Sequence, residues 1–129
     1  GNLPLAFQGL VVVPLFCGYD EGSGAGRLYT FDVVGGRYEE QDYAATGSGG
    51  SEAKAFLKGA YSDGMSESEA MTIAVEALVA AAEEDAATGG PDLRRGIYPN
   101  VVVVNRVGIT EVADEQIAVV AETVLGGRP

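Results

Sequence analysis

The chain has 129 residues, enough for one domain with a sizeable hydrophobic core. Its 8 Lys and Arg residues against 19 Asp and Glu residues give a formal net charge of −11, and it has no histidine. Such an acidic chain repels phosphates, so nucleic acid and anionic membrane surfaces are poor partners, and no apolar run approaches the ~20 residues of a membrane span.

The first residues of the chain are unusual. Gly1, Asn2, Leu3 and Pro4 lead into apolar sequence without a methionine or a helix cap. This pattern predicts that the sequence begins inside a larger domain. The single Cys17 lies in the apolar run LVVVPLFCGY and indicates a core residue in a reducing compartment, which favours the cytosol.

Three strands are predicted in the first part of the chain. Residues 10–16 form an uninterrupted apolar run, typical of a strand buried on both faces. Residues 27–34 and 37–42 flank Gly35 and Gly36. Because glycine tolerates positive φ, this glycine pair predicts a β-hairpin.

Two helices are expected after these strands. Apolar residues recur at helical spacing beyond Ser51, which is the expected N-cap of the first helix. After a turn at residues 63–64, Ser66 and Glu69 have the spacing of a capping box, and the second helix should end at residues 89–91 (GGP). The apolar stripe expected on this second helix consists of Met71, Ala74, Val75, Leu78, Ala81 and Ala82.

A second pair of strands and a last helix complete the prediction. Residues 100–105 read as a buried strand, and residues 107–112 should return beside it. Asp114 is the expected cap of a helix with apolar positions at helical spacing. The order β-β-β-α-α-β-β-α indicates a layered α+β protein.

Several familiar chemistries do not fit these residues. The stretch TGSGG at residues 46–50 has Thr46 where a serine-hydrolase elbow needs glycine, and the chain lacks the histidine of a Ser–His–Asp relay. The same loop lacks a phosphate-binding lysine ending, and Glu52 adds negative charge where an anion would bind. One cysteine without histidine cannot supply the usual zinc ligands, so a zinc site is not expected. No other metal and no cofactor is predicted.

The carboxylates of EEDAATGGPD (residues 83–92) remain as candidates. Glu83 and Glu84 have the pattern of a solvated helix end. Asp85 continues the inward stripe through Ala81, where an ionised side chain needs partners, and negative charge at a helix C-terminus opposes the dipole. From these residues alone, a capped helix end and a functional carboxylate stay equally open for Asp85.

Short motifs occur along the whole chain. They are GNL (1–3), QGL (8–10), PL (14–15), GYD (18–20), GRL (26–28), FD (31–32), GG (35–36), GSG (47–49), ATGGPD (87–92) and RGIYP (95–99). In this order they resemble the second half of a proteasome β-subunit. ATGGPD and RGIYP are most similar to the actinobacterial 20S form.

This resemblance implies the fold and the chemistry of the N-terminal-nucleophile hydrolases. The fold would be a four-layer αββα sandwich, and residues 1–129 would be the C-terminal portion of a single β-type domain. The activity would be that of a threonine endopeptidase, whose N-terminal threonine uses its own α-amine as the base, so no histidine is needed. By the family's motifs, Ser48, Asp85 and Thr88 would surround that threonine. The threonine itself would lie in the family's first half, so this chain would be inactive alone.

The resemblance also implies an assembly and a location. The family's β-subunits form a homo-oligomeric heptameric ring, stacked on α-subunits and served by an ATPase ring, and they degrade unfolded or tagged proteins in the cytoplasm without a cofactor. Two alternatives stay open. The simpler two-ring bacterial protease is not expected to carry TGGPD (residues 88–92), and a noncatalytic ring subunit has no need of Ser48 together with Asp85 and Thr88.

Overall fold

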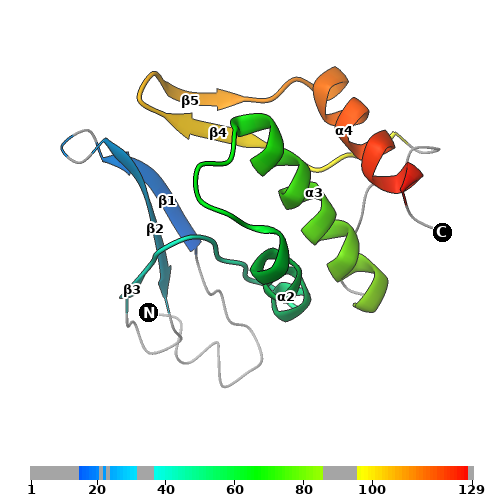
Figure 1. Ribbon diagram of the computed structural model, residues 1–129, viewed down its shortest axis with the longest axis horizontal. Coiled ribbons are helices and arrows are strands. Elements are labelled where there is room, and N and C mark those ends of the chain that lie inside the picture. The colour runs from blue at the N-terminus through cyan, green and yellow to red at the C-terminus, as the bar shows by residue number, and fades with distance from the viewer. Residues whose placement is uncertain (1–14, 21, 23, 32–36, 86–95, 128–129) are drawn as a thin grey trace, which may run out of the picture.

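The computed structural model describes residues 15–20, 22, 24–31, 37–85 and 96–127. Within this part, the elements follow the predicted order of three strands, two helices, two strands and a helix. The described residues therefore form a mixed α+β fold (Figure 1), and the four-layer sandwich stays a prediction. The elements are β1 (Leu15–Asp20), β2 (Ala25–Phe31), β3 (Arg37–Glu40), α2 (Gly50–Ala60), α3 (Glu67–Glu84), β4 (Val102–Asn105), β5 (Gly108–Glu111) and α4 (Asp114–Gly126).

The first three strands form one antiparallel sheet in the order β1-β2-β3. Leu15 pairs with Thr30, and Thr30 pairs in turn with Tyr38. The pairing of β2 with β3 confirms the predicted hairpin, although its glycine turn lies outside the described residues. The strand predicted at residues 10–16 is described only from Leu15, and it continues to Asp20, beyond its predicted end. The backbone of Cys17 belongs to this strand, but its side chain is not described.

Helix α3 begins as the sequence predicts. Ser66 is its N-cap, and the Ser66 hydroxyl accepts a hydrogen bond from the Glu69 N–H at 3.1 Å. In return, the Glu69 carboxylate accepts one from the Ser66 N–H at 3.3 Å. This capping box satisfies two backbone donors that the helix itself leaves unpaired.

The other two predicted caps are wrong. The N-cap of α2 is Gly49 and that of α4 is Ala113, so neither helix has a side-chain cap. Ser51 lies inside α2 because the preceding turn already starts the helix at Gly50. Asp114 is the first residue of α4, where its charge still complements the positive end of the helix dipole.

Replacing Ser66 by alanine should lower the free energy of unfolding of the complete subunit by about 1 kcal/mol, because one capping hydrogen bond is lost. Chemical denaturation of the purified subunit measures this change. Ser51→Ala is the matched control and should change stability little, since Ser51 does not cap α2. Equal losses in the two variants would contradict the assigned caps.

Helix α3 packs against a neighbour on each side. Toward α2, Ala77 and Ala81 form a buried cluster with Ala53. Toward α4, Val75 and Val79 form a second cluster with Val124. Figure 1 shows α3 (green) with α2 and α4 on either side of it. One small core lies between α2 and α3, and a second lies between α3 and α4.

The predicted stripe on α3 is buried at its edges and open in its middle. At about 100° per residue, Ala74 and Leu78 lie between the face toward α2 and the face toward α4. Both side chains are exposed, Leu78 by 39%. The expectation that Ala74 and Leu78 are buried is therefore wrong, because α2 and α4 cover only the flanks of the stripe. The helix also ends at Glu84, before the predicted residues 89–91, which lie outside the described part.

The second hairpin pairs β4 with β5 as predicted, with Val104 opposite Ile109. Its burial differs from the prediction of a buried strand. Val102 is 51% and Ile109 77% exposed on one face, and Val107 in the connecting turn is 93% exposed. The hairpin thus presents an apolar outer face, which we define as Val102, Val107 and Ile109.

No helix of the described part is long and apolar enough to cross a bilayer.

Candidate active-site region

The segment before α2 runs alongside that helix. At one end, the Tyr43 ring lies 5.7 Å, centroid to centroid, from the ring of Tyr61, which follows the C-terminus of α2. Further along, Ala45 packs against the cluster that contains Ala53. The segment then reaches the N-terminus of α2 at Gly49. It is therefore held along the whole helix, from one end to the other.

The Tyr61 side chain also interacts with a neighbouring carboxylate. The Tyr61 hydroxyl donates a hydrogen bond to Asp63 Oδ1 at 3.2 Å. Desolvation raises the pKa of the Tyr61 phenol above its usual value, and the hydrogen bond and the charge of Asp63 raise it further. The phenol therefore stays neutral at physiological pH and anchors the segment as an uncharged aromatic side chain.

A tight turn at residues 47–50 carries the candidate serine. The Gly50 N–H donates to the Gly47 carbonyl at 3.0 Å, which closes the turn. Gly49 has φ −91° and ψ 8°, the values of the second central residue of a type I turn. Ser48 is accordingly the first central residue. Its side chain is exposed, whereas Gly49 and Gly50 are buried.

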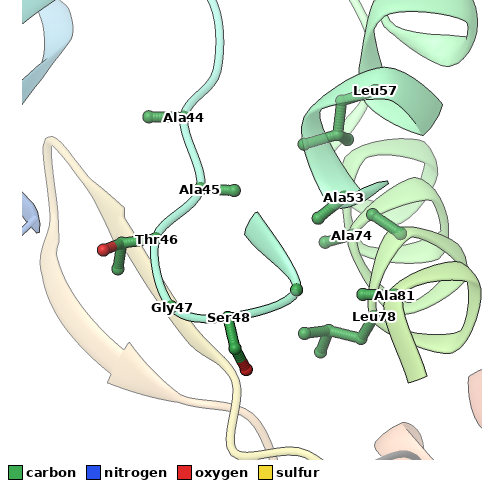
Figure 2. A pocket seen from close by; sticks show the side chains of 12 residues that line it. Ala44, Ala45, Thr46, Gly47, Ser48, Ala53, Leu57, Ala74, Leu78 and Ala81 are labelled. Atoms are coloured by element: carbon green, nitrogen blue, oxygen red, sulfur yellow. The ribbon is translucent and has the colours of Figure 1, made fainter. Parts of the chain in front are cut away.

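Ser48 borders an apolar pocket of about 480 Å³, which we call the alanine pocket. One wall is the segment of residues 44–49. The other wall consists of side chains from α2 and α3, and Figure 2 shows Ala45 pointing toward them and Thr46 pointing away. In the same view, Ser48 and Leu78 lie at the same end of the pocket. The wall residues are Ala53, Leu57, Ala74, Ala77, Leu78 and Ala81.

A second, more polar hollow of about 640 Å³ lies at the same turn, lined in part by Thr46, Ser48, Ser51 and Lys54. The Lys54 side chain is exposed, as expected for a solvated face of α2. Because Ser48 borders both hollows, this residue lies on the boundary between an apolar and a polar surface. A chemical group bound next to Ser48 could therefore contact the alanine pocket and the polar hollow at the same time.

Asp85 lies at the end of α3, one helical turn past the alanine pocket. It is the C-cap residue, half-buried and extended, with φ −130° and ψ 111°, and its N–H donates to the Ala81 carbonyl at 2.9 Å. Ala81 borders the pocket, but Asp85 is not among the residues that line it. Thr88 falls in residues 86–95, outside the described part. Ser48 thus lies on the same pocket as the side chains of α3, and Asp85 lies one helical turn beyond the last α3 residue of that pocket.

The sequence-based prediction missed two features of this region. It assigned Ala74 and Leu78 to the core, although both line the open pocket. The available signal was the width of the apolar stripe on α3, which is too broad for one neighbouring helix to cover. It also gave Gly47 no conformational role, although the residue type was the available signal, because glycine adopts positive φ readily. The described residues contain no cluster of three or more His, Cys, Asp and Glu side chains suited to a metal ion.

Comparison with known proteins assigns the class of this molecule. A family model described as "Proteasome subunit" matches residues 6–92. The chain therefore belongs to the proteasome subunit family.

Its relatives indicate the type of subunit. The chain is 54% identical over 120 residues to "Proteasome subunit beta" of Acidimicrobium ferrooxidans, covering 93% of this chain and 44% of the relative. It is 49% identical to the protein of the same name from Acidothermus cellulolyticus, over 98% of this chain and 45% of the relative. It is 50% identical to the protein of the same name from Rhodococcus erythropolis, over 99% of this chain and 46% of the relative. Within the family the chain is thus of the β-subunit type, and it spans less than half the length of these relatives.

Proposed function

We propose that the chain is the C-terminal portion of a threonine endopeptidase subunit of a 20S proteasome core. The observation that carries this proposal is the 49–54% identity to proteins named proteasome subunit beta over nearly the whole chain. The exposed Ser48 on a well-defined turn supports it, because the family's motif has a serine in the same GSG sequence. The nucleophilic threonine would come from a part of the parent subunit outside residues 1–129.

In the proposed reaction, the hydroxyl oxygen of the N-terminal threonine attacks the peptide carbonyl and forms an ester bond as the C–N bond breaks. The threonine α-amine accepts the hydroxyl proton and passes it to the leaving amine. Water then hydrolyses the ester and regenerates the hydroxyl. No imidazole takes part, which agrees with a chain that contains no histidine.

Ser48 and Asp85 would hold this nucleophile. A hydroxyl both donates and accepts hydrogen bonds, so Ser48 suits an amine that alternates between charged and neutral forms. A half-buried carboxylate is stabilised by a cation within hydrogen-bonding reach, and an ammonium provides one. Thr88, three residues after Asp85, would supply a second hydroxyl beside the carboxylate. Each of the three would act as a positioning and tuning group for the threonine.

The proposed assembly is a heptameric ring of identical β-subunits, stacked on rings of α-subunits. An ATPase ring would feed it unfolded or tagged proteins, and the particle would act in the cytoplasm. A noncatalytic ring subunit is the alternative, and the two differ in the residue at the mature N-terminus. The peptidase requires threonine there with a free α-amine, whereas a structural subunit does not.

Co-expression of the complete subunit with α-subunits should give particles of stacked seven-membered rings whose mature β-subunit begins with threonine. Native mass spectrometry measures the assembly, N-terminal sequencing identifies the residue, and a fluorogenic peptide reports turnover. Assembled particles with another N-terminal residue and no turnover would indicate the structural subunit. A processed subunit that stays monomeric beside its α-subunits would contradict both assignments to a ring.

A further inference from the structure

Gly47 has a backbone conformation that L-residues rarely adopt. Its φ is +94°, outside the regions open to most side chains. A Cβ atom added there would meet nothing within 4 Å. Space is therefore available for a side chain at Gly47, and the constraint comes from the backbone alone.

Both sides of this residue are held in place. Before it, Ala45 packs against the buried cluster of α2 and α3. After it, Gly50 closes the turn onto Gly47, and a Cβ on Gly50 would lie 3.5 Å from the Ala45 carbonyl, in van der Waals contact. A change in φ at Gly47 is not easily absorbed by these packed neighbours. It would instead rotate the exposed residues beside Gly47, which are Thr46 and Ser48.

We propose that Gly47 is a positioning residue, whose positive φ directs the Ser48 hydroxyl to the boundary between the alanine pocket and the polar hollow beside it. This inference rests on the proposed function, in which Ser48 holds the N-terminal threonine. A side chain at Gly47 then lowers turnover through the orientation of Ser48, without touching substrate.

Gly64 provides a matched control within the same chain. It also has a positive φ, +78°, and a Cβ there would likewise meet nothing within 4 Å. It follows Asp63 in the turn between α2 and α3, whereas Ser48 precedes the opposite end of α2. Alanine at Gly64 therefore imposes a comparable backbone strain with no direct route to Ser48.

The test compares Gly47→Ala, Gly64→Ala and Ser48→Ala in complete particles assembled with α-subunits. The two glycine variants should lower the melting temperature by similar amounts. Only Gly47→Ala and Ser48→Ala should lower kcat for a fluorogenic peptide, by about 10- to 100-fold, because a displacement of ~1 Å at an active site can cost ~10²-fold. KM should change little, since Ser48 acts on the nucleophile and not on the substrate. Gly47→Asn should recover part of the lost kcat, because asparagine tolerates positive φ.

The outcomes separate the two proposals. If Ser48→Ala lowers kcat but Gly47→Ala lowers it no more than Gly64→Ala, the positioning role of Gly47 is wrong and the role of Ser48 stands. If Ser48→Ala leaves kcat unchanged, the proposed role of Ser48 fails, and that of Gly47 with it. If Gly47→Ala particles do not assemble, Gly47→Asn is compared with Gly64→Asn, because asparagine reduces the strain at positive φ without removing it. A kcat for Gly47→Asn between those of Gly64→Asn and Ser48→Ala supports the inference, and a kcat equal to that of Gly64→Asn overturns it.

Discussion

Replacing Asp85 by asparagine in the complete subunit should reduce peptide turnover by about 10²–10⁴-fold, the usual contribution of a positioned acid–base group. The particles should still assemble, because an amide has nearly the shape of the carboxylate it replaces. Maturation should slow as well, since the same threonine hydroxyl would perform that cleavage. Fluorogenic peptide hydrolysis by the purified particles measures the effect.

The position of Asp85 explains why turnover should suffer more than folding. The residue is the half-buried C-cap of α3, where a negative charge opposes the helix dipole. Removing that charge therefore relieves an unfavourable interaction with the dipole. In the proposed role, the substitution would also remove the charged hydrogen bond to the threonine ammonium, which an amide would replace with a weaker neutral one.

Glu84→Gln is the matched control for this prediction. Glu84 is adjacent in sequence and carries the same charge, but its side chain is exposed at the end of α3. The change should leave turnover nearly unaltered. Asp85→Asn particles that mature and cleave at the unmodified rate would show that EEDAATGGPD is a helix end without a catalytic role.

Residues 1–129 produced alone should aggregate or melt without a cooperative transition. The apolar outer face of the β4–β5 hairpin is largely exposed, with Val107 at 93% and Ile109 at 77%. An uncovered apolar hairpin presents side chains and strand edges on which other copies can pair. Size-exclusion chromatography and circular dichroism during heating measure the two properties.

A pair of charge substitutions tests the cause of this aggregation. Ile109→Glu removes apolar surface from the outer face and should increase the soluble fraction. Thr110→Glu adds the same charge at the neighbouring position, which faces the other side of the strand, and should help less. If the unmodified residues 1–129 are a soluble monomer with a cooperative melt, the prediction of aggregation is wrong and this part of the subunit folds independently.

Several local features of this chain are determined by the sequence alone, although the N-caps of α2 and α4 were not predicted from it. The capping box of Ser66 and Glu69 needs only residues three apart, and both of its hydrogen bonds are present in the structure. Both hairpins and the order of elements follow from short patterns of alternation, helical spacing and glycine. The same holds for the motifs that indicate the proteasome family, because a motif is local by definition.

Burial was decided by the tertiary structure. The apolar stripe of α3 is a property of the sequence, but Ala74 and Leu78 are open because α2 and α4 cover only its flanks. Val102 belongs to an apolar run and is nevertheless half-exposed, since among the described elements nothing covers the outer face of its hairpin. An apolar pattern shows which side chains favour burial, whereas the packing of distant elements decides which of them are buried.

The candidate site divides in the same way. The residue types at Ser48 and Asp85 are visible in the sequence, and they suffice to suggest their chemistry. Their surroundings are not visible: the positive φ of Gly47, the alanine pocket beside Ser48 and the place of Asp85 one turn past its wall. These depend on how segment 43–49 packs along α2 and how α2 packs on α3. Contacts between residues far apart in the chain set that packing, and no short stretch of sequence encodes them.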